Sequence, residues 1–323
     1  MGKGDYKMIN VNEEMIKNNI MRCHKEDYFV LKSNAYGFGL SRVASLLASL
    51  GYHKYAVLTL DEAITIRELD PSGTILLLGV LENDKIFLYE KYGITVSIND
   101  FKDLKSLYMH KLKIQIAVNT GMNRFGIRPT EVKEMVNLIR KTSLELMGIY
   151  SHNATNDLMH IMGQEEAFKY ALRATTGLEA HFAATPLSHD SKYKICRIGK
   201  GMYQNALSVY GKIVKINHLE KDEYVGYDYA YKMPYDGYIG VIDLGYADGL
   251  VRHIDGFLVY INNRYYHMVG LACMNHSFVL LDNDNIKEGA LVHFISPFNN
   301  QINYETFTGL SAYEIYLGFL KKY

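Results

Sequence analysis

Short apolar runs alternate with helix-like segments along the first two-thirds of the chain. The runs are five to seven residues long, as is typical of buried strands. Eight strands are predicted, at residues 28–32, 55–60, 74–79, 94–98, 113–119, 146–152, 180–185 and 194–199. Segments with a helical pattern lie between them, for example at 40–50, 60–70 and 129–141. From about residue 223 the pattern changes to short alternating strands separated by Gly, Asn and Asp turns.

Strands that alternate with helices indicate right-handed βαβ units and a parallel sheet. About eight such units in about 220 residues fit an α/β barrel of the TIM type; a doubly wound sheet is the alternative. The later alternating strands predict a second, mostly-β domain. We therefore expect an α/β barrel over residues 1–222 and a β domain over residues 223–323.

The composition argues against several classes of partner. The 323 residues are 48% hydrophobic and carry no net charge, so no global field favours nucleic acid or anionic membranes. No apolar run approaches the roughly 20 residues that a membrane helix needs. The three cysteines (Cys23, Cys196 and Cys273) form no CxxC pair, which favours a reducing compartment. We expect a cytoplasmic protein without a nucleic-acid or membrane partner.

One lysine stands at the end of the first predicted strand. Lys32 is followed by Tyr36, Gly37 and Gly39. In a barrel, the carboxyl ends of the strands carry the site, and partial burial there lowers the pKa of an ammonium group and prepares it for covalent chemistry. A solvated surface lysine is the alternative. The two glycines fit a turn beside a bulky ligand better than a dinucleotide loop, which needs a third glycine.

Seven segments, in order, resemble those of the alanine racemase family. They are "LKSNAYGFG" (31–39), "AVLTLDEAITIREL" (56–69), "VNTGMNRFGI" (118–127), "GIYSHNATND" (148–157), "RIGKGMYQ" (197–204), "DLGYADGLVR" (243–252) and "VGLACMNHSFVLLD" (269–282). Together they span nearly the whole chain. The resemblance implies an N-terminal eight-stranded α/β barrel, a C-terminal β domain and pyridoxal 5'-phosphate as the cofactor.

The resemblance also implies a two-base racemisation of an amino acid. Lys32 would carry the cofactor and act as one base, and Tyr246 would act as the other base from the opposite face. A single base on one face cannot readily deliver the proton to the other face. A free tyrosine has a pKa near ~10, so a tyrosine base needs positive charge or hydrogen bonding nearby.

Further residues match the family's contacts to the cofactor. His152 and Arg197 match a relay from the tyrosine towards the pyridine nitrogen. Because a guanidinium donates hydrogen bonds without giving up its proton, that nitrogen would stay unprotonated. The residues implied for the phosphate are Tyr36, the backbone of Gly199 and Lys200, and Thr185 in place of a serine. The family generally has an apolar residue where this chain has Lys200.

Two residues match positions that meet the substrate carboxylate: Arg124 and the backbone of Met274. In the family, the equivalents of Arg124, Tyr246 and Met274 reach into the neighbouring subunit's site. The resemblance therefore implies a homodimer with shared active sites. No metal site is implied: a related barrel lyase would use a His-x-Cys pair near the C-terminus, and here Cys273 and His276 have another order and spacing.

Three positions depart from the family pattern. Ala117 replaces a lysine that, in many family members, becomes carbamylated and braces the carboxylate-binding arginine. That brace is lost here unless an anion such as chloride takes over its role. Asn119 and Asn275 each replace an aspartate. Alanine is the expected substrate. Serine or another amino acid, and a degenerate paralogue that binds pyridoxal phosphate without turnover, are the alternatives.

Overall fold

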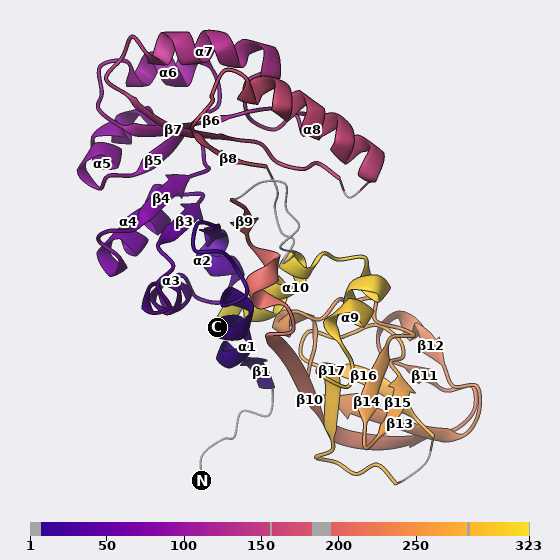
Figure 1. The fold of residues 1–323 in the computed structure, drawn as a ribbon. Coiled ribbons are helices and arrows are strands. Elements are labelled where there is room, and N and C mark those ends of the chain that lie inside the picture. Colours follow the sequence, from indigo (N-terminus) through magenta and orange to yellow (C-terminus); the bar gives the residue numbers. More distant parts are fainter. Residues whose placement is uncertain (1–7, 156, 183–194, 283–284, 323) are drawn as a thin grey trace. The chain divides into compact units, whose positions relative to one another are not determined.

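The protein consists of two compact units, each continuous in space. The computed structural model describes residues 8–155, 157–182, 195–282 and 285–322. One unit is Lys17–Met202, and the described residues before and after it form the other (Figure 1). The second unit includes a long strand, β10 (Leu207–Leu219), which precedes the boundary expected between residues 222 and 223. It therefore begins earlier in the chain than the alternating pattern indicated.

The first unit is a nearly closed barrel of eight parallel strands. In order of hydrogen bonding the strands are β8 (Glu179–His181), β7 (Glu145–Tyr150), β6 (Lys113–Ala117), β5 (Thr95–Ile98), β4 (Thr74–Leu77), β3 (Lys54–Val57), β2 (Tyr28–Val30) and β9 (Arg197–Ile198). Each overlaps one predicted strand, so the barrel prediction is confirmed. The alternative, a doubly wound sheet, is not observed among the described strands.

Helices cover the outside of the barrel (Figure 1). Those in the unit are the end of α1 (Glu13–Ile20), α2 (Lys32–Tyr36), α3 (Leu40–Ser49), α4 (Leu60–Leu69), α5 (Ile86–Lys91), α6 (Phe101–Leu107), α7 (Val132–Ile139) and α8 (Leu158–Leu172). The longer helices pack apolar residues inward, whereas α2 is a left-handed turn. In α7 these residues are Val132, Met135, Val136 and Ile139. Strands enclosed by helices on one side and by the barrel interior on the other are buried on both faces, which explains their nearly continuous apolar runs.

The second unit is mostly antiparallel sheet, as predicted. Its main sheet has the order β15 (Arg264–His267), β14 (Leu258–Ile261), β17 (Leu291–Ile295), β10, β13 (Gly237–Ile242) and β16 (Ser277–Leu281), and β1 (Met8–Val11) also pairs with β10. A small hairpin joins β11 (Tyr224–Val225) and β12 (Tyr231–Lys232). Two helices, α9 (Gln301–Thr308) and α10 (Ala312–Phe319), follow and were not predicted. Within the described ranges, no helix has the length and apolarity needed to cross a membrane.

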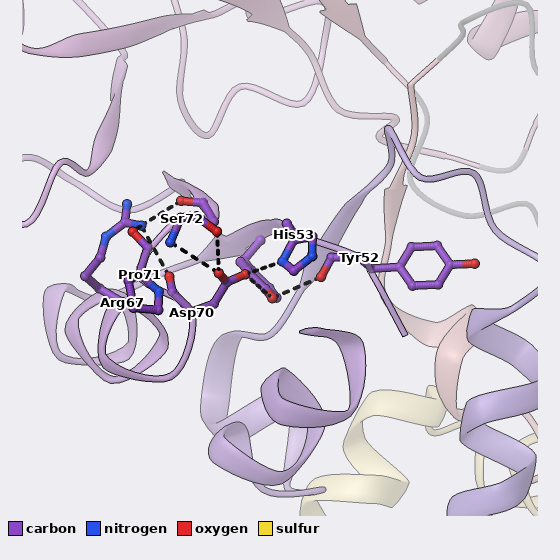
Figure 2. A network of polar contacts seen from close by, with 8 residues as sticks. Tyr52, His53, Arg67, Asp70, Pro71 and Ser72 are labelled. Atoms are coloured by element: carbon purple, nitrogen blue, oxygen red, sulfur yellow. Dashed lines mark hydrogen bonds and ion pairs between the residues drawn. The ribbon is translucent and has the colours of Figure 1, made fainter. Parts of the chain in front are cut away.

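A buried carboxylate ties the end of α4 to β3 (Figure 2). Asp70 accepts hydrogen bonds from the Tyr55 hydroxyl at 2.8 Å, from His53 Nδ1 at 2.7 Å and from the Ser72 hydroxyl at 3.1 Å. Burial alone would raise the pKa of Asp70, but these hydrogen bonds outweigh burial and hold it below its ordinary value. The ionised carboxylate therefore stabilises the fold.

We expect Asp70→Asn to lower the free energy of unfolding by about 2–3 kcal/mol at pH 7, because charge-assisted hydrogen bonds are lost from a buried site. A carboxyl whose folded pKa is lowered contributes stability above its unfolded pKa of about 4, and that contribution is lost as the pH falls through the folded pKa. Urea unfolding should therefore show the gap between wild type and variant narrowing below about pH 4. Asp61→Asn, an exposed position on the same helix, is the control, with an expected change under about 1 kcal/mol. A gap that stays constant down to acidic pH would contradict this account.

Candidate active site

Lys32 lies two residues after the end of β2, where the chain enters a left-handed turn. Ser33, Asn34, Ala35 and Tyr36 have φ values of 54°, 55°, 52° and 56°. This conformation costs a non-glycine residue roughly 1–2 kcal/mol. Hydrogen bonds hold the turn in place: Glu62 of α4 accepts from the Asn34 backbone N–H at 3.3 Å, and the Asn34 side chain accepts from the Leu40 N–H at 2.7 Å. The turn fixes where the Lys32 side chain leaves the barrel wall.

The amine of Lys32 is half-buried at this end of the barrel. Its pKa is lowered from the ordinary value, first by burial and then by the positive charge of Arg124, while the carboxylate of Glu62 acts in the opposite direction. The amine lies 6.0 Å from the centre of the Tyr36 ring. A lowered pKa increases the fraction of neutral amine, the form that attacks a carbonyl. The interpretation of Lys32 as a purely solvated lysine does not fit this burial.

Arg197, the first residue of β9, is only 3% exposed, and both of its terminal nitrogens donate hydrogen bonds. Its Nη1 donates to His181 Nδ1 at 2.6 Å and to the His181 carbonyl oxygen at 3.1 Å, and its Nη2 donates to the Ser151 carbonyl oxygen. The guanidinium lies 5.0 Å from the centre of the Tyr150 ring. Burial lowers the pKa of Arg197 to about 10, so it stays protonated at neutral pH. A fixed cation therefore lies inside the barrel.

His152, just after β7, is the next group along from Arg197. Its Nδ1 lies 3.4 Å from Arg197 Nη2 and accepts from it, which places the imidazole proton on Nε2. Burial, followed by the charges of Arg197, Arg124 and Lys32, lowers the pKa of His152 to about 4. At neutral pH this histidine is an uncharged donor through Nε2–H. The structure thus brings His152 and Arg197, the two residues expected in the relay, within hydrogen-bonding distance.

Arg124 lies in a loop that follows β6 and is organised by Asn119. The Asn119 side-chain oxygen accepts from the backbone N–H of Gly121 at 3.1 Å and of Asn123 at 3.0 Å, and its amide donates to the Asn123 side chain at 3.0 Å. An amide, unlike a carboxylate, can make all three bonds. This gives a structural reason for asparagine at position 119, which the sequence pattern alone had shown only as a lost charge.

The Arg124 side chain itself is exposed, and among the described residues it makes no hydrogen bond or ion pair. Ala117 is buried and level with Tyr150 on the neighbouring strand, so it offers no brace. The resemblance had placed Arg124 in a neighbouring subunit's site. Here it belongs to the same unit as Lys32, and its charge acts on the pKa of Lys32 and of His152 in its own chain.

The residues expected at the phosphate follow two paired strands. β2 and β9 run side by side, with Phe29 opposite Ile198. Tyr36 in the turn after β2 is buried, and Gly199 and Lys200 come directly after β9, at the start of a short 3₁₀ turn. Adjacent parallel strands end at the same edge, so these groups share one end of the barrel with Lys32. Thr185 lies outside the described residues.

Tyr246 and Met274 are brought together in the second unit. The Tyr246 backbone N–H donates to the Cys273 carbonyl oxygen at 3.0 Å, and the Ala247 N–H donates to that of Met274 at 2.9 Å. This close approach requires Gly245, where a Cβ would lie 2.5 Å from the Met274 carbonyl oxygen. The side chains of Tyr246 and Met274 are 42% and 56% exposed. Asn275 follows Met274 in the same loop.

Sequence reasoning missed His181. It is fully buried in β8, accepts from Arg197 through Nδ1, and stacks on the Tyr150 ring at 5.2 Å. The available signal was a histidine inside the apolar run "AHFAAT", which most often marks a core histidine bonded to the backbone. Only the packed barrel shows that its partner is Arg197.

The groups of the barrel unit suit pyridoxal phosphate. A half-buried amine with a lowered pKa suits the aldehyde, and a fixed, protonated guanidinium suits the pyridine nitrogen. A buried tyrosine and backbone N–H groups after β9 suit the phosphate. Lys32, Tyr36 and the N–H groups after β9 follow the carboxyl ends of barrel strands, as the barrel fold requires of a site, and Arg197 lies within β9.

The fold and these groups are those of a barrel enzyme with a carbonyl cofactor. Comparison with known families is consistent with this class. The family model described as "Alanine racemase, N-terminal domain" matches residues 5–206, and the one described as "Alanine racemase, C-terminal domain" matches residues 206–323. The chain therefore belongs to the alanine racemase family, whose members are isomerases that depend on pyridoxal phosphate.

Individual relatives are distant but cover most of the chain. An alanine racemase from Fusobacterium nucleatum is 28% identical over 84% of this chain and 85% of its own length, and one from Ligilactobacillus salivarius is 29% identical over 84% and 83%. Among solved structures, an alanine racemase from E. faecalis has a TM-score of 0.87 at 24% identity over 99% of this chain and 97% of that one. A histidine racemase from Leuconostoc mesenteroides has a TM-score of 0.79 at 23% identity over 98% and 96%.

Proposed function

We propose that this protein interconverts L- and D-alanine with pyridoxal phosphate by a two-base mechanism, with Lys32 and Tyr246 as the bases. The observation that carries the proposal is the half-buried Lys32 amine of lowered pKa, placed at the end of β2 in the same unit as Arg197, His152 and Arg124. Membership of the alanine racemase family and the curated relatives named above support the reaction class and the substrate.

The roles of the barrel residues follow from their charges. Bound pyridoxal phosphate would make the α-proton of an attached amino acid more acidic by accepting electron density. Lys32 Nζ would hold or release the proton on one face, and the exposed Arg124 would orient the substrate carboxylate. Arg197 would donate to the pyridine nitrogen while keeping its own proton, since its pKa of about 10 leaves it charged at neutral pH.

The second base would come from the other unit. Tyr246 would take or return the proton on the opposite face, and Met274, whose backbone is fixed beside it, would meet the substrate carboxylate. His152 is uncharged and presents Nε2–H, so it would donate to the tyrosine oxygen and stabilise the phenolate form. Because Arg197 fixes Nδ1 as an acceptor, this donor direction is built into the relay.

We further propose a cytoplasmic homodimer with shared active sites. The family resemblance supports the shared site, with Tyr246 and Met274 supplied by the partner. Their side chains are substantially exposed, and so are Met122 and Phe125 in the loop that carries Arg124. Apolar side chains exposed on functional loops are what an interface would cover.

A racemase for another amino acid is the second candidate, and one observation favours it. Arg124 makes no hydrogen bond or ion pair among the described residues, although its guanidinium lies 5.9 Å from the centre of the Phe125 ring, and Ala117 supplies no charged group at the position of the expected brace. A less restrained arginine could accept a carboxylate in more than one position. The histidine racemase of similar fold shows that such a barrel is compatible with a different amino acid in another protein. Serine is the smallest such alternative to alanine.

The test follows α-deuteration and chirality together in D₂O, with the cofactor-loaded protein and each L-amino acid in turn. We expect deuterium to appear with inversion for alanine, at a rate well above that of the other amino acids. Inversion confined to serine or a larger amino acid would replace alanine as the substrate. No exchange with any amino acid would leave the degenerate pyridoxal-phosphate binder as the better account.

A further inference from the structure

Five polar side chains form one hydrogen-bonded line through the barrel interior. Arg197 Nη1 lies 2.6 Å from His181 Nδ1, and His181 Nε2 lies 2.7 Å from Gln115 Oε1. Gln115 Nε2 then lies 3.0 Å from the Tyr28 hydroxyl, which lies 2.9 Å from Glu179 Oε2. Tyr28, Gln115 and His181 are buried. The line therefore links the cation of the proposed site to a carboxylate away from it.

The strand register shows that the line crosses from one layer of the barrel to the next. Gln115 is level with Gly148, and Gly148 is level with Glu179. His181 lies two residues beyond Glu179 on the same face of β8, one layer closer to the end that carries His152. Gly148 has no side chain between Gln115 and Glu179. A Cβ at this position would not fit, since it would lie 2.8 Å from the Glu179 carbonyl oxygen.

The far end of the line meets a cavity and a small ion-pair cluster. The cavity has a volume of about 510 Å³ and is lined by Tyr28 and Glu179 together with residues that begin neighbouring strands, such as Thr74, Thr95 and Lys113. Lys54 holds Glu179 at 2.6 Å and Glu26 at 2.8 Å. This end of the barrel is the one opposite to Lys32, because it is formed by strand starts.

The chemistry of the two ends sets the direction of every bond between them. A guanidinium only donates, so His181 Nδ1 must accept and its proton must sit on Nε2. That proton is donated to Gln115 Oε1, which turns the Gln115 amide nitrogen towards Tyr28. The Tyr28 oxygen accepts from it and donates its own proton to Glu179, which only accepts. Arg197 at one end and Glu179 at the other therefore require the same direction of hydrogen-bond donation along the line.

We propose that Tyr28 and Glu179 are positioning residues for Arg197, which act by holding His181 in the Nε2–H tautomer with its Nδ1 lone pair on the guanidinium. Their importance for turnover rests on the proposed function of Arg197; the tautomer itself does not.

The alternative state explains what the line prevents. Burial and the charges of Arg197 and Lys54 keep the pKa of His181 well below its ordinary value, so the ring is neutral and has two tautomers to choose from. If Gln115 reversed its amide, its nitrogen would face His181 and favour the Nδ1–H tautomer. The Nδ1 atom could then no longer accept from Arg197, and a buried guanidinium would lose one of its acceptors.

The experiment reads the tautomer directly by ¹⁵N NMR of histidine-labelled protein, with and without pyridoxal phosphate. His181 is assigned as the signal that disappears in His181→Gln. We expect wild type to show the Nε2–H tautomer. Tyr28→Phe removes the hydroxyl that connects Glu179 to Gln115, and Glu179→Gln removes the terminal charge. Both variants should show a mixture of tautomers, and the loaded enzymes should lose about tenfold in kcat with little change in KM.

Two matched controls separate this effect from a general loosening of the barrel. Tyr150→Phe removes another buried hydroxyl, which bonds Ser97 outside the line, and Glu26→Gln removes the other carboxylate on Lys54. Neither should alter the His181 tautomer. The proposal is overturned if Tyr28→Phe and Glu179→Gln, checked as folded by thermal melting, keep the wild-type tautomer, or if Tyr150→Phe shifts it equally. A shifted tautomer without turnover on any amino acid would instead defeat the proposed function and leave the positioning intact.

Discussion

Replacing Lys32 by alanine should abolish covalent attachment of the cofactor and reduce racemisation by at least ~10³-fold, because the change removes a nucleophile and a base at once. The physical ground is the half-buried amine, whose pKa is lowered by burial and by the charge of Arg124. Borohydride reduction of the loaded protein followed by peptide mass spectrometry should find the cofactor on the peptide that contains Lys32. In Lys32→Ala that labelled peptide should be absent.

A lysine at the opposite end of a barrel strand provides the control. Lys113 begins β6 and is exposed, so Lys113→Ala should keep both the label on Lys32 and the rate. Lys32→Arg adds a second comparison, because it keeps a positive charge but presents no neutral amine. If Lys32→Ala still bound the cofactor covalently, another amine would be the attachment site and the proposed role of Lys32 would be wrong.

Tyr246→Phe should separate proton exchange from inversion. With one of two bases removed, we expect inversion to fall by roughly 10²–10⁴-fold, the usual contribution of a positioned acid or base. Lys32 remains, so one enantiomer of alanine should still exchange its α-proton for deuterium with retention. The measurement is the ratio of α-deuteration to loss of optical activity for each enantiomer. Equal loss of both processes for both enantiomers would contradict the assignment of Tyr246 to a single face.

The same two variants test whether the sites are shared. If Tyr246 of one subunit works opposite the partner's Lys32 in a shared site, a mixed dimer of Lys32→Ala and Tyr246→Phe contains one site with both native bases. Mixing and re-assembling the two inactive proteins should then restore part of the activity, whereas either protein alone should not. Activity that never returns, despite dimers shown by sedimentation, would indicate that both bases come from one chain.

The barrel was predictable because its pattern is local and repeated. Each strand is a short apolar run, and some helices begin at a recognisable signal, such as Thr59 and Glu62, which form a capping box at the start of α4. The β character of the second unit was equally visible. Its extent was not, because β10 and β1 join a sheet through pairings that are distant in sequence. The helices α9 and α10 were missed, although Ser311 and Glu314 form a capping box at the start of α10.

For the candidate site, the sequence motifs predicted which residues belong to it but not what surrounds them. The segments around Lys32, His152, Arg197 and Tyr246 pointed to the residues, but the motifs said nothing of their surroundings. The Tyr28, Gln115 and Glu179 line arises from strand register across β2, β6 and β8, which no single segment contains. The role of Asn119 as the organiser of the Arg124 loop depended on seeing its three hydrogen bonds at once.

The turn after Lys32 also has a stereochemical consequence. Ser33 to Tyr36 are L-residues in a backbone geometry that D-residues adopt without strain, because the Cβ clash that penalises left-handed turns depends on handedness. A D-alanine placed at position 35 by chemical synthesis would relax the segment. In the L-chain, the side-chain hydrogen bonds of Glu62 and Asn34 and the backbone hydrogen bonds of the turn offset this strain. The stability of the fold and the placement of Lys32 therefore compete within these four residues. Substitutions that relax the turn would raise the free energy of unfolding but would move the Lys32 side chain.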